Sequence, residues 1–257
     1  IQRQRITFTS EIKIVDYKIE EDLVTSADKA AQDIYLRILD ENFPLAGIVA
    51  EENFARKCKD PDHNYYFTVD PLDGTKAFGR RQSHAVSTMI SFVFDGEVVG
   101  ITIGDPNTNE LFHSRPLSEK VHRIYEFETS QLLQVDKKKS LKDSYLQLRC
   151  DPRKLSPRAL ATVEKFKDIE VGGGSIGISF TRLWKGEVGG VLLEKGTGYQ
   201  TPWDSCPFFG MSKKMGYSFF TLEKDTFQRY EFKPSEENIF IGRELLCIHE
   251  SKISEIK

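Results

Sequence analysis

The residues best suited to chemistry lie in one short segment of the chain, which reads Val69-Asp70-Pro71-Leu72-Asp73-Gly74-Thr75. Asp70 and Asp73 are carboxylates three positions apart, and Gly74 and Thr75 predict a helical turn whose free N–H groups can hold an anion. Two carboxylates facing such a turn suit a divalent cation placed between them and a phosphate oxygen, because Mg²⁺ prefers oxygen ligands. The alternative is that both aspartates only cap a turn, since Asp-Pro and Asp-Gly are common turn pairs.

Two further acidic segments favour the metal hypothesis. Ala50-Glu51-Glu52 follows an apolar, strand-like run at 47–49, and Trp203-Asp204 is expected to open a helix. Taken alone, each has an ordinary explanation, an exposed loop for the glutamates and an N-cap for Asp204. Spacing does not prove that these groups converge. Four carboxylates at strand ends and helix starts are nevertheless what a phosphoryl site with two or three metal ions needs.

The elements of the first half predict one helix and a largely antiparallel sheet. A helix is expected over 26–41, after the N-cap pair Thr25-Ser26. A buried strand at 65–69 is expected to end where it presents Asp70, because the next residue, Pro71, cannot donate to a strand ladder. Asp95-Gly96 separates two β-rich runs at 86–94 and 97–104 and predicts a hairpin. A further strand is expected at 111–112.

In the second half of the chain, helices and strands are expected to alternate. Helices are expected over 157–166, from Ser175 to 186 and over 203–216, with a strand at 188–193 between the last two. Alternation of this kind is typical of α/β proteins. A soft boundary is expected between about 115 and 140, near the basic loop at 137–139.

Composition excludes several classes of protein. The 257 residues carry a net charge of −3 and are 39% hydrophobic, which argues against wholesale disorder and gives no reason to expect nucleic acid or an anionic membrane as partner. No apolar run approaches the ~20 residues of a membrane-spanning helix. The N-terminus shows no signal peptide, and the four cysteines have no metal spacing, so free thiols in a reducing cytoplasm are expected.

The acidic segments together resemble the inositol monophosphatase family, which comprises Mg²⁺-dependent, lithium-sensitive phosphomonoesterases. Four segments carry the resemblance in the family's order: Leu23-Val24-Thr25-Ser26-Ala27-Asp28, Ala50-Glu51-Glu52, Asp70-Pro71-Leu72-Asp73-Gly74-Thr75 and Trp203-Asp204-Ser205. They span most of the chain. The resemblance implies a layered α-β-α-β-α sandwich of the sugar-phosphatase type, and commonly a homodimer.

The resemblance also implies roles for individual residues. Glu51, Asp70, the Leu72 carbonyl and Thr75 would surround the first and the activating Mg²⁺, and Asp70, Asp73 and Asp204 would hold the second. A metal-bound water, deprotonated with help from Thr75 and Asp28, would attack phosphorus in line. The catalytic residues implied are therefore Asp28, Glu51 and Thr75, and the Gly74 and Thr75 amides would cradle the phosphate.

Substrate choice is expected to depend mainly on the second half. Ser175, after the glycine run 172–174, and Glu194, near a family carboxylate that binds substrate hydroxyls, are the candidate substrate contacts. Lys76 occurs in the bisphosphate-nucleotidase branch of the family and in others, and Arg80 and Arg81 suit a second phosphate or simply water. One departure from the family pattern is the bulky pair Phe208-Phe209, which raises a question about the packing of that helix and the pocket wall.

The sequence therefore predicts a phosphomonoesterase that uses two or three Mg²⁺ ions to hydrolyse inositol monophosphate or a similar polyol phosphate. One alternative is a nucleotidase acting on 3′-phosphoadenosine 5′-phosphate, and another is a non-catalytic Mg²⁺-binding relative that acts as a protein partner. Residues 1–125 are expected to form the metal-binding half, and residues 126–257 an α/β half that carries Trp203-Asp204, within one continuous unit. A small phosphorylated metabolite is the expected partner, in a cytoplasmic homodimer without nucleic acid or membrane.

Overall fold

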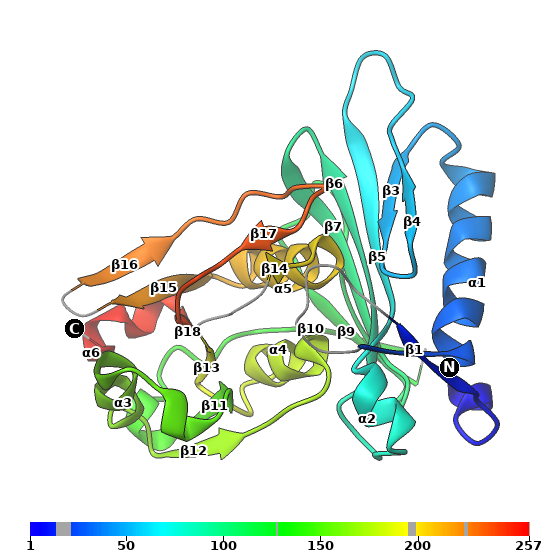
Figure 1. Ribbon diagram of the computed structural model, residues 1–257. Coiled ribbons are helices and arrows are strands. Elements are labelled where there is room, and N and C mark those ends of the chain that lie inside the picture. Colours follow the sequence, from blue (N-terminus) through cyan, green and yellow to red (C-terminus); the bar gives the residue numbers. More distant parts are fainter. Residues whose placement is uncertain (14–21, 127, 195–198, 224–225, 257) are drawn as a thin grey trace.

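The computed structural model describes residues 1–13, 22–126, 128–194, 199–223 and 226–256. Its backbone forms two large β-sheets with helices between them and on both outer faces (Figure 1). The two chain ends lie at opposite sides of the molecule in this view. Among the described residues no helix is long and apolar enough to cross a membrane.

The first sheet has eight strands in the order β10-β9-β8-β7-β6-β5-β3-β4. Neighbouring strands are antiparallel except for the parallel pair β3 and β5. The strands are β3 (Gly47–Ala50), β4 (Phe54–Arg56), β5 (Tyr65–Asp73), β6 (Ser87–Phe94), β7 (Glu97–Asp105), β8 (Glu110–Ser114), β9 (His122–Tyr125) and β10 (Thr129–Leu132). The expected hairpin and the largely antiparallel first half are confirmed.

The second sheet has six strands in the order β12-β11-β13-β18-β15-β16. Its first three strands are parallel and the rest antiparallel, so only part of this half has the α/β arrangement that the sequence predicts. The strands are β11 (Tyr145–Arg149), β12 (Asp168–Val171), β13 (Gly190–Leu193), β15 (Tyr217–Glu223), β16 (Thr226–Tyr230) and β18 (Leu245–His249). Two small sheets pair β1 (Ser10–Lys13) with β2 (Asp22–Thr25) and β14 (Tyr199–Gln200) with β17 (Ile239–Phe240).

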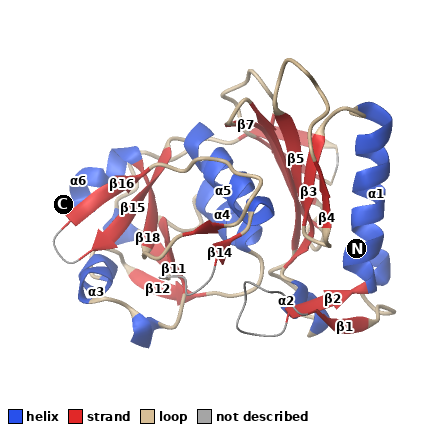
Figure 2. Cartoon of the chain, turned by 45° about the horizontal axis from the view of Figure 1, so that its top comes forward, coloured by secondary structure: helices blue, strands red, loops and turns tan. Residues whose placement is uncertain are grey.

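Six α-helices are described, and five of them form three layers. Helix α1 covers one face of the first sheet, α4 and α5 lie between the sheets, and α3 and α6 cover the far face of the second sheet (Figure 2). Their bounds are α1 (Ser26–Asn42), α2 (Thr75–Gly79), α3 (Pro157–Val163), α4 (Ile176–Trp184), α5 (Pro202–Lys214) and α6 (Ile253–Ile256). Short 3₁₀ turns lie at Gln2–Gln4, Leu141–Asp143, Pro152–Lys154 and Glu250–Lys252.

The layers are held by separate groups of buried apolar side chains. The largest group joins both sheets through α4 and α5 and includes Met89, Phe180, Phe208 and Phe219. A second group packs α3 and α6 on the second sheet, and a third packs α1 on the first. Buried and half-buried residues alternate along the whole of strand β6. This pattern is expected for a strand whose two faces are covered to different extents.

Strand β5 corrects one expectation from the sequence. The strand does not end at Asp70 but continues to Asp73. Asp70 pairs with Met89 and Asp73 pairs with Ser87, so Pro71 and Leu72 together oppose the single residue Thr88. This is a β-bulge, and a bulge is one of the few places where a sheet accepts a proline, because the extra residue needs no ladder donor.

The predicted boundaries of the helices are close to those observed. The structure ends α3 at Val163 and α5 at Lys214, a few residues before the sequence predicts, and begins β13 at Gly190. All four cysteines are free thiols, as expected. The division of the chain near residue 125 stays a prediction; β10, which ends at Leu132, pairs with β9 of the first sheet.

The centre of the molecule depends on Phe208, which is fully buried and stacks on Phe180 with ring centroids 4.6 Å apart. We expect Phe208→Ala to lower the free energy of unfolding by about 3–5 kcal/mol, because a large cavity would open between α4 and α5. Urea unfolding followed by circular dichroism measures this. Phe240→Ala is the control, since Phe240 is 58% exposed, and a loss there equal to that at Phe208 would contradict the assignment.

Candidate active site

Three carboxylates that lie far apart in the sequence meet where β5 ends and α5 begins. One carboxylate oxygen of each of Asp70, Asp73 and Asp204 lies within 4.8 Å of the others. Asp70 and Asp73 are buried, and Asp204, in the first turn of α5, is half-buried. The bulge in β5 explains how two aspartates three positions apart can face the same point. Carboxylate oxygens at this spacing are a donor set that fits Mg²⁺.

Glu51 joins the cluster through strand pairing. Strands β3 and β5 are parallel and in register from Gly47 opposite Tyr66 to Ala50 opposite Val69. The ladder continues one step further, because the Glu51 N–H donates to the Val69 carbonyl at 3.1 Å. Carboxyl ends of adjacent parallel strands lie at one edge of a sheet, so Glu51 comes beside Asp70.

The pKa of Asp70 shows how strongly these charges interact. Burial raises the pKa of Asp70 well above its ordinary value, and the negative charges of Glu51, Asp73 and Asp204 raise it further. The Leu72 N–H donates to Asp70 Oδ1 at 3.0 Å, which does not offset three neighbouring carboxylates. Ionised Asp70 therefore requires a cation in the space between the acids.

Asp73 is held by four donors from neighbouring elements. Its Oδ2 accepts from the hydroxyls of Ser87 at 3.0 Å and Ser175 at 2.6 Å and from the Gly177 N–H at 2.8 Å, while its Oδ1 accepts from the Ile176 N–H at 3.1 Å. Two of these donors are free amides at the start of α4, where a negative charge is stabilised. The carboxylate of Asp73 is thus fixed in one orientation.

Asp28 is fully buried at the start of α1 and contacts Thr75, which lines the cavity that the carboxylates share. Thr25 caps the helix, and its N–H donates to Asp28 Oδ2 at 2.8 Å in a capping box. The Thr75 hydroxyl lies 3.0 Å from Asp28 Oδ1 and 3.0 Å from the Leu72 carbonyl, so its single proton is shared between two acceptors. Burial raises the pKa of Asp28, which makes this carboxylate a better proton acceptor near neutral pH.

These groups line one open cavity of about 280 Å³. The lining combines the acids with two exposed basic side chains, Lys76 and Arg80. The lining residues are Glu51, Asp70, Leu72, Asp73, Gly74, Thr75, Lys76, Arg80, Gly174 and Asp204. Gly74 has a φ of 90°, and a Cβ there would come 2.4 Å from the Ala85 carbonyl oxygen, so only glycine fits this turn.

A model of the inositol monophosphatase family matches residues 3–244. The chain belongs to this family. Over 92 residues it is 35% identical to the Nus factor SuhB of Escherichia coli K12, and over 95 residues it is 34% identical to the Nus factor SuhB of Pasteurella multocida. These matches cover 35% and 37% of the chain and 33% and 34% of the relatives, so the chain spans about a third of the length of these curated proteins.

Solved structures of the family share the fold. The extragenic suppressor protein SuhB of Bartonella henselae has a TM-score of 0.72 at 18% identity, over 99% of this chain and 89% of that one. An IMPase/NADP phosphatase complexed with NADP and Ca²⁺ has a TM-score of 0.67 at 16% identity, over 99% and 86%. A staphylococcal inositol monophosphatase-1 soaked in lithium chloride reaches 0.66 at 17%, over 99% and 86%. The predicted layered sandwich is therefore confirmed.

Two residues predicted to contact substrate do not line the cavity. Ser175 is 1% exposed; its hydroxyl bonds to Asp73 and accepts from the Ile178 N–H at 2.9 Å as the N-cap of α4. Glu194 is exposed after β13. Burial raises the pKa of Cys150 and the charge of Glu194 raises it further, which places Glu194 near that thiol. In this arrangement Ser175 orients a carboxylate, and the predicted roles of both residues toward a substrate stay predictions.

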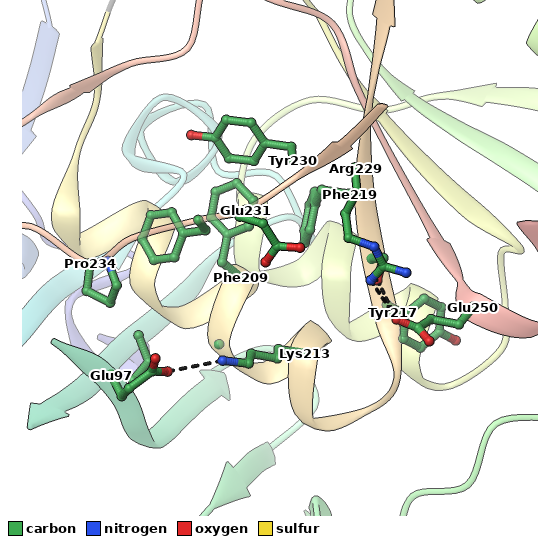
Figure 3. A pocket seen from close by; sticks show the side chains of 14 residues that line it. Glu97, Phe209, Lys213, Tyr217, Phe219, Arg229, Tyr230, Glu231, Pro234 and Glu250 are labelled. Carbon is green, nitrogen blue, oxygen red and sulfur yellow. Dashed lines mark hydrogen bonds and ion pairs between the residues drawn. The ribbon is translucent and has the colours of Figure 1, made fainter. Parts of the chain in front are cut away.

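The phenylalanine pair in α5 packs away from the carboxylates. Phe208 points into the core, and Phe209 stacks on Phe232 with ring centroids 4.3 Å apart. Phe209 lines a separate cavity of about 230 Å³ between α5 and the β15–β16 hairpin (Figure 3). The basic groups of that cavity are paired with acids, Lys213 with Glu97 at 3.1 Å and Arg229 with Glu250 at 2.7 Å. The aromatic pair therefore forms no part of the wall of the carboxylate cavity.

One charged residue near the site, Arg149, belongs to no motif that would have identified it from the sequence. Arg149 ends β11, and its side chain lies behind the first turn of α4. Burial lowers the pKa of Arg149, and the carboxylates of Asp73 and Asp204 act in the opposite direction. A basic residue at a strand end is a common surface feature, so its sequence context gives no signal.

Asp70→Asn is expected to stabilise the metal-free protein at neutral pH, because burial and the neighbouring negative charges disfavour the ionised Asp70 carboxylate. A carboxyl group whose pKa is raised binds more protons in the folded than in the unfolded state. The stability of the metal-free parent should therefore fall as pH rises from about 4 through the raised pKa, and less so in the variant. Thermal unfolding in a chelator from pH 4 to pH 8 measures both effects.

The same experiment includes Mg²⁺. Added Mg²⁺ should raise the melting temperature of the parent and raise that of Asp70→Asn much less, since a ligand that binds only the folded state stabilises it. A metal-free variant less stable than the parent, or equal stabilisation of both by Mg²⁺, would contradict the carboxylate cluster as the metal site.

Proposed function

We propose that this chain is a Mg²⁺-dependent phosphomonoesterase that acts on inositol monophosphate or a similar small polyol phosphate. The observation that carries the proposal is the set of Asp70, Asp73 and Asp204, whose oxygens lie within 4.8 Å of one another in one cavity. Membership of the inositol monophosphatase family supports it. Magnesium at such a site supplies an electrophile that acidifies water and offsets charge on a phosphate ester.

The chain's own residues would then divide the work. Asp70, Asp73 and Asp204 would hold one ion, and Asp70, Glu51 and the Leu72 carbonyl would hold the others. The Thr75 hydroxyl stands between the cavity and Asp28, so a proton taken from water by Thr75 can pass to Asp28 Oδ1 at 3.0 Å. Burial raises the pKa of Asp28, and a raised pKa suits this carboxylate to receive that proton. The Gly74 and Thr75 amides would cradle the phosphate.

One observation favours the second candidate, a nucleotidase acting on 3′-phosphoadenosine 5′-phosphate. Lys76 and Arg80 line the same cavity as the carboxylates. Two basic groups beside the metal ligands would attract a second phosphate or another anionic group of the substrate. The structure of an IMPase/NADP phosphatase bound to NADP offers a related precedent for a nucleotide in this fold.

The non-catalytic alternative remains relevant because the curated relatives are Nus factors by name. Each predicted carboxylate ligand is present in this chain, which favours catalysis over it. We retain lithium sensitivity, a homodimer and a cytoplasmic location as expectations from the resemblance.

The first test is phosphate release with and without Mg²⁺ and Li⁺ from inositol 1-phosphate, 3′-phosphoadenosine 5′-phosphate, histidinol phosphate and fructose 1,6-bisphosphate. One strongly preferred, Mg²⁺-dependent substrate is expected, and its identity separates the two candidates. Asp70→Asn should lose at least ~10³-fold in turnover, since it removes a ligand shared between ions. Release from no substrate by a folded protein that binds Mg²⁺ would favour the non-catalytic alternative.

Thr75→Val is expected to lower kcat by about 10²–10⁴-fold, the usual contribution of a positioned proton-transfer group. Valine keeps the shape of threonine and removes the hydroxyl between the cavity and Asp28. Thr75→Ser keeps the hydroxyl, so it should retain most activity and the Mg²⁺ affinity of the parent. Steady-state kinetics and calorimetry give the two quantities, and full activity in Thr75→Val would exclude the proton path.

A further inference from the structure

Arg149 lies at the carboxyl edge of the three parallel strands of the second sheet. Its guanidinium donates to backbone carbonyls rather than to a carboxylate. Nη2 donates to the Gly174 carbonyl at 2.8 Å, and Nη1 donates to the Ser175 carbonyl at 2.8 Å and to the Ser179 hydroxyl at 2.7 Å. The planar fork of an arginine can bridge two successive carbonyls in this way, whereas a lysine ammonium is a point charge.

Each of the two peptide groups that Arg149 binds also donates through its N–H, and one of them donates to Asp73. The Ser175 carbonyl accepts from Arg149, and the N–H of the same peptide group, that of Ile176, donates to Asp73 Oδ1 at 3.1 Å. The preceding peptide group accepts from Arg149 at Gly174, and its N–H, that of Ser175, donates to the Ala85 carbonyl at 2.9 Å. Each peptide is thus held at both ends.

A peptide group placed between a cation and an anion is polarised by both. Hydrogen bonds to charged groups are stronger than neutral ones, and successive bonds in such a chain strengthen one another. The chain from the guanidinium through the Ser175–Ile176 peptide to Asp73 fixes the rotation of that peptide. Because the Ile176 N–H donates to Asp73 Oδ1, the same chain sets the direction of that oxygen.

We infer that Arg149 is a positioning residue for Asp73, which it orients through the Ser175–Ile176 peptide so that the carboxylate presents its remaining lone pairs to a divalent cation. The inference rests on the proposed function for its metal, although the peptide geometry can be tested without metal.

A simple charge effect predicts the opposite sign. A cation near Asp73 and Asp204 repels Mg²⁺, so removing its charge would tighten Mg²⁺ binding if charge alone mattered. Positioning predicts that binding weakens even when the charge is kept. Arg149→Lys keeps the charge and loses the fork, and Arg149→Gln loses the charge and keeps an amide donor, so the pair separates the two effects.

The experiment measures Mg²⁺ binding by calorimetry, without substrate, in the parent, Arg149→Lys and Arg149→Gln. Both variants are expected to bind more weakly by about 10–100-fold at one site, the usual result of losing a group that orients a metal ligand. With the preferred substrate, kcat at subsaturating Mg²⁺ should fall while KM changes little. Arg182→Gln is the matched control, because Arg182 ties α4 to β12 through Glu170 at 2.6 Å but lies outside the cavity lining.

Amide hydrogen exchange of the metal-free proteins gives a second, independent readout. The Ile176 and Gly177 amides should exchange faster in both Arg149 variants than in the parent and Arg182→Gln. If Arg149→Lys does not fold, Ser179→Ala removes one anchor of the guanidinium and should shift both readouts in the same direction by a smaller amount.

The outcomes distinguish this inference from the proposed function. Unchanged Mg²⁺ affinity and unchanged exchange in folded Arg149 variants, or tighter binding in Arg149→Gln, would overturn the inference alone. A parent protein that neither binds Mg²⁺ nor releases phosphate would overturn the proposed function, and the exchange rates of Ile176 and Gly177 would still decide whether Arg149 holds the peptide.

Discussion

The repulsion among buried carboxylates is the interaction on which the rest of this structure depends. Asp70 is nearly inaccessible and is surrounded by the charges of Glu51, Asp73 and Asp204. Burying like charges is costly unless each is met by donors or by a cation. The fold meets this need unevenly, since Asp73 accepts four hydrogen bonds whereas Asp70 accepts from the Leu72 amide and otherwise faces acids. Asp70 is therefore the carboxylate that most needs a cation.

The donors come mainly from the first turns of helices. Helix α1 begins with a Thr-x-x-Asp box at Thr25 and Asp28, and α5 begins with the same spacing, in which the Thr201 hydroxyl donates to Asp204 Oδ2 at 2.8 Å. Helix α4 offers its free amides to Asp73. Helix starts stabilise negative charge, so a site rich in carboxylates is more easily built where several helices begin. The sheets serve to bring those starts together.

Local features of this site could be predicted from the sequence, and features that depend on packing could not. The Asp70–Thr75 segment and the Thr25 cap are read directly, because turn and cap chemistry is decided by adjacent residues. The bulge at Pro71 was not predicted, because its pairing depends on where β6 lies. Ser175 is correctly predicted to start a helix. Its hydroxyl, however, donates to Asp73, which is 102 residues away in the sequence. Arg149 gave no signal, since its partners are main-chain carbonyls of another segment.

The same contacts bear on how the chain is divided. Asp73 belongs to β5 of the first sheet, whereas its donors Ile176 and Gly177 belong to α4, and Arg149 behind them belongs to β11 of the second. Asp204 reaches the cluster from α5, which packs in the core between the sheets. Each half alone would leave buried charges without donors, or donors without charges. The predicted division near residue 125 stays a prediction, and the contacts at Asp73 and Asp204 join elements from both sides of it.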